Sequence, residues 1–140
     1  MKLEKNSINE LAPCGVFCGA CPSFNKTCLG CASADRNQRR TSKFGCTIRT
    51  CCYEEKGLDF CVECDEYPCQ RIIKKLINSH PNDSKFTYRH EIPEIFEKLK
   101  TMNLHDFLEF QKKRWQCKFC KGTVQFYHYK CGTCEKEQMI

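Results

Sequence analysis

Fifteen of the 140 residues are cysteine, and most of them stand in closely spaced pairs. Such a content is typical of a small chain held together by disulfides or metal ions rather than by a large apolar core. The number is odd, so a complete disulfide framework would leave one free thiol. Residues Met1 to Asn6 contain no apolar run of the kind found in secretory signals, so we expect a cytoplasmic protein, where disulfides do not persist. Metal binding is therefore the preferred interpretation.

The cysteines divide the chain into three parts. Eleven lie between residues 14 and 69, none between 70 and 116, and four between 117 and 134. We predict a small metal-stabilised α+β protein with an irregular Cys-rich N-terminal module (1–70), a helical segment packed on it (71–115) and a C-terminal zinc-ribbon β-hairpin (116–140). No apolar run is long enough for a membrane helix, so we expect no membrane partner.

The cysteine-free part has the apolar periodicity of two to three amphipathic helices. The first is predicted to begin at Pro68 and to end in the segment 78–81. A second is predicted to start at Pro93, and a third after Asn103, whose side chain is a suitable N-cap. The polar composition of residues 82–90 predicts a loop.

The C-terminal cysteines give the clearest signal. Two C-x-x-C pairs, Cys117 with Cys120 and Cys131 with Cys134, are separated by ten residues. Each pair can form a tight turn with both thiolates on one side, and four thiolates complete a tetrahedron around Zn²⁺. The residues 124–129 between the pairs are rich in aromatic side chains and predict a hairpin. A site closed by four protein ligands is structural.

The N-terminal cysteines include three more C-x-x-C pairs, and Cys52, next to Cys51, is interpreted as a spare thiol. Eleven thiols are enough for two four-thiolate sites, so we expect one or two further zinc ions; an iron–sulfur cluster is the alternative, because both use thiolates in tetrahedral surroundings. The separated pairs favour zinc. The spacing of the first three cysteines is also that of radical enzymes with a 4Fe–4S cluster; this chain is too short for the large barrel of those enzymes, so only the cluster remains as an alternative. Sequence order does not reveal which cysteines share a metal. The predicted N-terminal ligands are Cys14, Cys18, Cys21, Cys28, Cys31, Cys46, Cys51, Cys61, Cys64 and Cys69.

The segment from Ala12 to Pro22, APCGVFCGACP, resembles the opening motif of the uncharacterised Cys-rich family named domain of unknown function 3795. The motifs at 28–31, 46–51 and 60–69 are similar to later motifs of that family, and residues 114–134 are similar to the ribbon that ends many of its members. The resemblance spans roughly residues 10 to 135. It supports the metal sites and implies no activity. One departure is Lys121, which separates Cys120 from a glycine that more commonly follows the cysteine directly.

The net charge of +6 lies entirely in residues 70–140, which hold fourteen basic and eight acidic side chains. Basic and aromatic residues alternate around the ribbon, a pattern that suits single-stranded nucleic acid. A zinc ion with four thiolates is negatively charged, however, so the same lysines can act as its counter-charges, which is the favoured interpretation. The residues concerned are Lys112, Lys113, Arg114, Lys118, Lys121 and Lys130, with Trp115, Phe119, Phe126, Tyr127 and Tyr129.

These features predict a zinc-binding module with structural four-cysteine sites that serves protein or nucleic-acid interaction. The alternative is an iron–sulfur redox or cofactor-handling protein of anaerobic metabolism; zinc storage or delivery is a third hypothesis. The sequence contains no paired carboxylates in an acid–base arrangement, no phosphate-binding glycine loop and no His-rich zinc enzyme motif, which favours a non-enzymatic role. Asp65 and Glu66 are interpreted as an exposed acidic turn.

Overall fold

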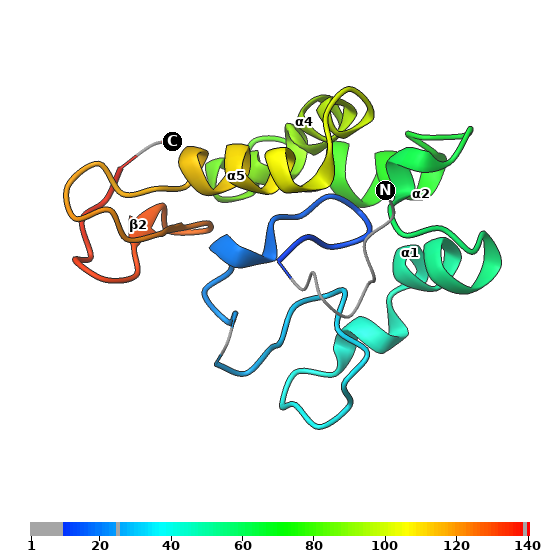
Figure 1. The fold of residues 1–140 in the computed structure, drawn as a ribbon, viewed down its shortest axis with the longest axis horizontal. Helices are drawn as coiled ribbons and strands as arrows, with labels where there is room; N and C mark the ends of the chain where they lie inside the picture. Colours follow the sequence, from blue (N-terminus) through cyan, green and yellow to red (C-terminus); the bar gives the residue numbers. More distant parts are fainter. Residues whose placement is uncertain (1–9, 25, 139) are drawn as a thin grey trace.

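The computed structural model describes residues 10–24, 26–138 and 140. The α-helices are α1 (Thr47–Thr50), α2 (Gln70–Ile72), α3 (Thr87–His90), α4 (Ile92–Glu97) and α5 (Leu104–Arg114). The two strands are β1 (Val124–Gln125) and β2 (Lys130–Cys131), which pair antiparallel with Val124 opposite Cys131. In Figure 1, α5 connects the hairpin on the left with the other helices on the right, and the N-terminal loops lie below it.

Several helices continue in tighter or wider turns. A π turn, Cys51–Glu55, extends α1, and a second one, Ile73–Ile77, extends α2. A 3-10 turn, Lys98–Lys100, extends α4. Further 3-10 turns are Cys18–Ala20, Ser42–Gly45, Cys61–Glu63 and Ser84–Phe86. The predicted small α+β class is therefore confirmed in outline, but the helices are more numerous than the two or three that the sequence predicts.

The three predicted helices of the middle segment are confirmed. Pro68 precedes α2, and the helical run ends at Asn78. Pro93 occupies the first turn of α4, where its missing N–H costs no hydrogen bond. The side chain of Asn103 accepts a hydrogen bond from the backbone N–H of Asp106 at 2.8 Å and so caps α5.

The predicted loop at residues 82–90 is wrong. The segment contains the turn Ser84–Phe86 and α3, and Asp83 caps the turn by accepting a hydrogen bond from Lys85 N. Tyr88 is buried in α3 and stacks on Phe126 with ring centroids 4.0 Å apart. An aromatic partner far away in the sequence therefore stabilises a helix that its own polar composition does not predict.

The helix α1 was also not predicted. Its four residues have only one buried member, Ile48, so the segment shows no amphipathic period. Ile48 contributes to the first of two hydrophobic cores, which gives this short helix a place to pack.

The first core joins the N-terminal module to the helices. Leu11, Val62 and Ile72 pack there against Phe96 of α4 and Phe107 of α5. The approach is close at Gly15, whose φ is +105°, because a Cβ on this residue would lie 2.6 Å from Ile92 Cγ2. Only glycine fits this left-handed backbone position beside α4.

The second core joins the N-terminal module to the hairpin. Its buried residues come from the start of the chain, from α3, from the end of α5 and from the ribbon: Phe17, Ala20, Tyr88, Trp115, Cys117, Val124, Phe126, Tyr129 and Cys131. The predicted division at residues 1–70, 71–115 and 116–140 remains a prediction, and its first nine residues lie outside the described part of the chain, but each of these segments shares a core with another.

Of the helices formed by the described residues, none combines the length and the apolar character required to cross a bilayer.

Candidate metal centre

Four cysteine sulfurs meet at the base of the hairpin. The Sγ atoms of Cys117, Cys120, Cys131 and Cys134 all lie within 4.8 Å of one another. The distance from Cys117 Sγ to Cys134 Sγ is 3.6 Å, and that from Cys120 Sγ to Cys131 Sγ is 3.5 Å. Sulfurs bound to one zinc ion at about 2.3 Å each are separated by similar distances. The predicted C-terminal group of four cysteines is therefore present and could hold a metal.

The first C-x-x-C turn points backbone N–H groups at its leading sulfur. The N–H groups of Phe119 and Cys120 donate to Cys117 Sγ at 3.4 and 3.5 Å. Lys121 N donates to Cys117 O at 3.2 Å, and Cys117 N donates to Gly122 O at 2.7 Å. Hydrogen bonds of this kind stabilise the thiolate form that a metal requires.

The second turn repeats the same pattern. Thr133 N and Cys134 N donate to Cys131 Sγ at 3.3 and 3.5 Å. Glu135 N donates to Cys131 O, and Cys131 N donates to Lys136 O, both at 3.0 Å. The two turns thus present their sulfurs in equivalent backbone frames, as a symmetric tetrahedral site needs.

The residue that follows each turn is left-handed. The φ of Lys121 is +64° and that of Glu135 is +63°. A side chain in this conformation is strained, and glycine is favoured there. Lys121, where this chain departs from the family pattern, therefore stands at a position whose left-handed backbone favours glycine.

The side chain of Gln138 supports the site from outside. Its amide Nε2 donates to Cys117 Sγ at 3.1 Å, and its Oε1 accepts from Lys118 N at 2.9 Å. Although desolvation opposes ionisation, the N–H groups of Cys120 and Phe119 and the Gln138 amide together lower the pKa of Cys117 to about 6. The pKa of Cys131 is also lowered, first of all by the Cys134 N–H. Nothing in the sequence spacing identified Gln138 as a member of the site.

Backbone hydrogen bonds hold the hairpin on the rest of the protein. Val124 N donates to Trp115 O at 2.6 Å, next to the end of α5. Phe126 N donates to Ala20 O at 3.1 Å and so attaches the hairpin to the N-terminal module. The four-cysteine group therefore lies within the ribbon, but the end of α5 and the N-terminal module hold the ribbon in place.

The eleven N-terminal cysteines are arranged differently. In the described part of the chain they form no group of three ligand atoms within 4.8 Å. Cys14, Cys18, Cys21, Cys28, Cys31 and Cys46 instead line one cavity of about 340 Å³. Cys51, Cys61, Cys64 and Cys69 lie outside its lining. Cys52, interpreted from the sequence as a spare thiol, also lies outside it and is buried with its thiol 3.5 Å from Leu58 O.

Thiols inside this cavity affect one another. A hydrogen bond from Cys18, assisted by the positive charges of Lys43 and Arg40, lowers the pKa of Cys31 to about 6 against the effect of burial. The same contact with Cys31 raises the pKa of Cys18. Burial raises the pKa of Cys14 to about 12. The structure therefore brings Cys18 and Cys31 together although they belong to different C-x-x-C pairs.

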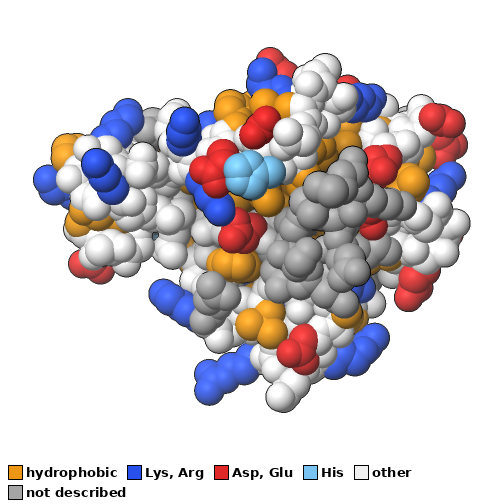
Figure 2. Space-filling model, viewed as in Figure 1, with side chains coloured by type: hydrophobic (Ala, Val, Ile, Leu, Met, Phe, Trp, Pro, Cys, Tyr) orange, Lys and Arg blue, Asp and Glu red, His pale blue; other side chains and the backbone are white. Residues whose placement is uncertain are grey.

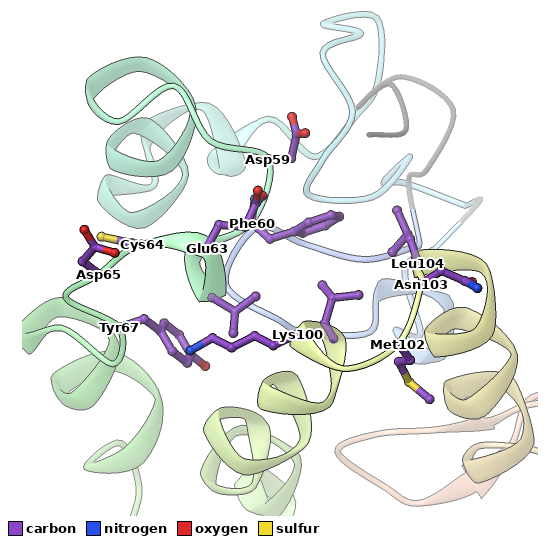
Figure 3. A pocket seen from close by; sticks show the side chains of 12 residues that line it. Asp59, Phe60, Glu63, Cys64, Asp65, Tyr67, Lys100, Met102, Asn103 and Leu104 are labelled. Carbon is purple, nitrogen blue, oxygen red and sulfur yellow. The ribbon is translucent and has the colours of Figure 1, made fainter. Parts of the chain in front are cut away.

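A second cavity, of about 520 Å³, has none of these thiols in its lining and is acidic (Figure 3). Asp59, Glu63 and Asp65 contribute carboxylates to its lining, and Lys100 contributes an ammonium group. The Glu63 carboxylate accepts a hydrogen bond from Phe60 N at 2.9 Å and so caps a turn. The predicted exposed acidic turn that contains Asp65 is confirmed. No three of these groups meet as a metal-ligand cluster within the described residues.

The chain thus belongs to the class of small Cys-rich α+β proteins, and four of its cysteines form a group that could hold a metal ion. More particularly, residues 10–74 match the family described as protein of unknown function, DUF3795. The resemblance seen in the sequence is confirmed over these residues, and the ribbon lies outside the matched part. Neither a curated protein nor a solved structure matches the chain.

Proposed function

We propose that the protein is a zinc-binding module in which a structural Zn²⁺ at Cys117, Cys120, Cys131 and Cys134 stabilises the ribbon as a contact surface for a partner. The observation that carries this proposal is the convergence of the four sulfurs within 4.8 Å. Because all four positions around the ion are filled by protein thiolates, none is open for a substrate. The proposal includes a cytoplasmic location, where thiols stay reduced.

The metal test is elemental analysis of anaerobically purified protein, with a visible spectrum of the same sample. We expect zinc that is lost on Cys117→Ser and retained on Cys52→Ser, whose thiol lies outside the ribbon. If the protein contains iron and Cys117→Ser loses that iron, the metal of the ribbon is iron and not zinc. Metal content unaffected by Cys117→Ser would overturn the assignment.

The partner surface is the part of the ribbon around the first C-x-x-C turn. Phe119 is 60% exposed, and Lys136 Nζ lies 4.2 Å from the centre of its ring. Lysine and arginine side chains are frequent over this end of the molecule in Figure 2, on the left. Trp115, Phe126 and Tyr129 are buried, however, so they are not free to stack on a base. A nucleic-acid partner would therefore have Phe119 as its main stacking platform.

Binding of a fluorescent single-stranded oligonucleotide tests this role. A nucleic-acid partner requires affinity that falls steeply with salt and decreases about fivefold or more on Phe119→Ala, since a stacked base contributes roughly 1–3 kcal/mol. Affinity that depends neither on the salt concentration nor on Phe119 would leave a protein as the partner of this surface.

A further inference from the structure

The six-cysteine cavity is enclosed by three parts of the protein. Its thiols come from the N-terminal module, Lys75 and Leu76 from the π turn after α2, and Arg89 from α3. Phe126 and Tyr127 of the hairpin complete the wall. The cavity of about 340 Å³ is thus formed by the folded protein as a whole and not by one cysteine-rich loop.

Positive charge surrounds the thiols. Lys43 is only 5% exposed, and its Nζ donates to Cys28 Sγ and to Gly30 O, both at 3.0 Å. It also donates to the side chain of Gln38. Lys75 Nζ donates to Cys46 Sγ at 3.5 Å. Burial of an ammonium group is costly unless a negative group compensates it, and thiolates are the negative groups available here.

The charge balance of the lining favours a thiolate-bound metal centre with a net negative charge. Arg40 and Arg89 add two guanidinium groups to the two lysines, and none of the described residues that line the cavity is an aspartate or a glutamate. A metal centre held by four thiolates carries a net negative charge and fits such a frame.

The spacing of the sulfurs separates a cluster from a single ion. In the ribbon, four sulfurs lie within 4.8 Å of one another, as one ion requires, whereas no three of the described cavity cysteines do so. Iron and sulfide atoms stand between the thiolates of a cluster, so its ligands are farther apart and need an intervening space. We propose that this cavity binds an iron–sulfur cluster of the four-iron, four-sulfide type.

Four of the six thiols are the ligands: Cys14, Cys18, Cys31 and Cys46. Cys31 N donates to Cys18 Sγ at 3.5 Å, so these two cysteines stand side by side in the cavity wall. Cys14 lies close enough to Cys31, Cys61 and Cys46 for their charges to interact, and of these three only Cys61 lies outside the lining of the cavity. Cys28 accepts hydrogen bonds from the buried Lys43 at 3.0 Å and from Gly30 N at 3.4 Å, whereas the contact of Lys75 with Cys46 is longer and exposed, so Cys28 acts in the frame around the cluster.

The test measures iron, sulfide and zinc in the same samples, using full-length protein purified anaerobically and then incubated with ferrous and ferric iron and sulfide. We expect about four iron and four sulfide per chain, a brown chromophore, and an electron paramagnetic resonance signal after one-electron reduction by dithionite. Protein that stays colourless, or that fills the cavity with zinc, would overturn the proposal. Zinc at the ribbon is read separately, so failure of one site does not imply failure of the other.

Single variants test the ligand assignment. Cys14→Ser, Cys18→Ser, Cys31→Ser and Cys46→Ser should each lose most of the iron and keep the ribbon zinc, whereas Cys64→Ser, outside the cavity, should keep both. Equal loss of iron in Cys64→Ser would show that iron binds without a defined site. Circular dichroism of each variant separates loss of ligation from loss of folding.

Lys43→Gln provides a readout that does not depend on removing a ligand. A positive charge beside the cluster stabilises its reduced, more negative form. The variant should retain its iron while its midpoint potential shifts to more negative values. The matched change Lys56→Gln, at an exposed lysine paired with Glu66, should leave the potential unchanged. Equal potentials in Lys43→Gln and the parent protein would contradict a cluster in this cavity.

Discussion

The two groups of cysteines differ in what brings their sulfurs together. In the ribbon, two short turns with the same backbone hydrogen bonds place four sulfurs within 4.8 Å. In the N-terminal module, six thiols from several separate segments face one cavity without forming such a group. The comparison teaches that a C-x-x-C pair shapes a metal ligand pair locally, whereas the grouping of pairs depends on the fold around them.

Removal of one ribbon ligand should have the largest effect. Cys131→Ser should lose the ribbon metal and with it an apparent binding free energy on the order of 10 kcal/mol, which here contributes to folding. Trp115 is the only tryptophan and is buried in the second core, so its fluorescence reports the loss. Cys52→Ser is the control and should keep both the metal and the emission. An unchanged Trp115 signal in Cys131→Ser would mean that packing alone holds the ribbon.

Truncation of the aromatic contact between the two regions comes next. Phe126 is 2% exposed and stacks on Tyr88. Phe126→Ala should lower the free energy of unfolding of the metal-loaded protein by about 3–5 kcal/mol, because it removes a buried ring and leaves a cavity. Denaturation with urea measures the change.

The exposed Phe119 gives the matched control for that ring. Phe119→Ala should change the stability by less than about 0.5 kcal/mol. Similar losses in both variants would show that the ribbon is not anchored through Tyr88 and that the two regions are independent.

The support from Gln138 should have a smaller effect. Gln138→Ala removes the amide that donates to Cys117 Sγ, and we expect roughly tenfold weaker metal affinity, as for other hydrogen bonds to metal ligands. Competition with a chelator measures this change. Gln116→Ala, at an exposed glutamine outside the set of groups that donate to the sulfurs, should bind as tightly as the parent. Equal metal affinities of the parent, Gln138→Ala and Gln116→Ala would mean that the backbone N–H groups alone stabilise the thiolates.

The smallest expected effect is a gain. Lys121→Gly should stabilise the ribbon by about 1 kcal/mol, because glycine adopts the left-handed φ of +64° without strain. Lys118→Gly removes the same charge at a position without positive φ and should give no gain. Thermal unfolding of the metal-loaded variants compares them, and a gain in both would point to charge rather than backbone strain.

The sequence predicted those features that depend on local residues. Asn103 identified the start of α5, and the two C-x-x-C pairs identified the ribbon. It did not predict α3, because Tyr88 finds its partner Phe126 only in the folded chain. The contact between Cys18 and Cys31 could not be predicted either, because the sequence spacing assigns these two cysteines to different C-x-x-C pairs. The supporting roles of Lys43 and Gln138 also depend on tertiary neighbours.

The hydrogen bond from Phe126 N to Ala20 O has a consequence for biosynthesis. A nascent chain leaves the ribosome with its N-terminus first, so Phe17 and Ala20 emerge long before the hairpin residues that cover them. A nascent chain that ends before Phe126 leaves this part of its apolar surface open to solvent and to chaperones. Closure of the second core therefore waits until Phe126 and Cys131 have left the exit tunnel.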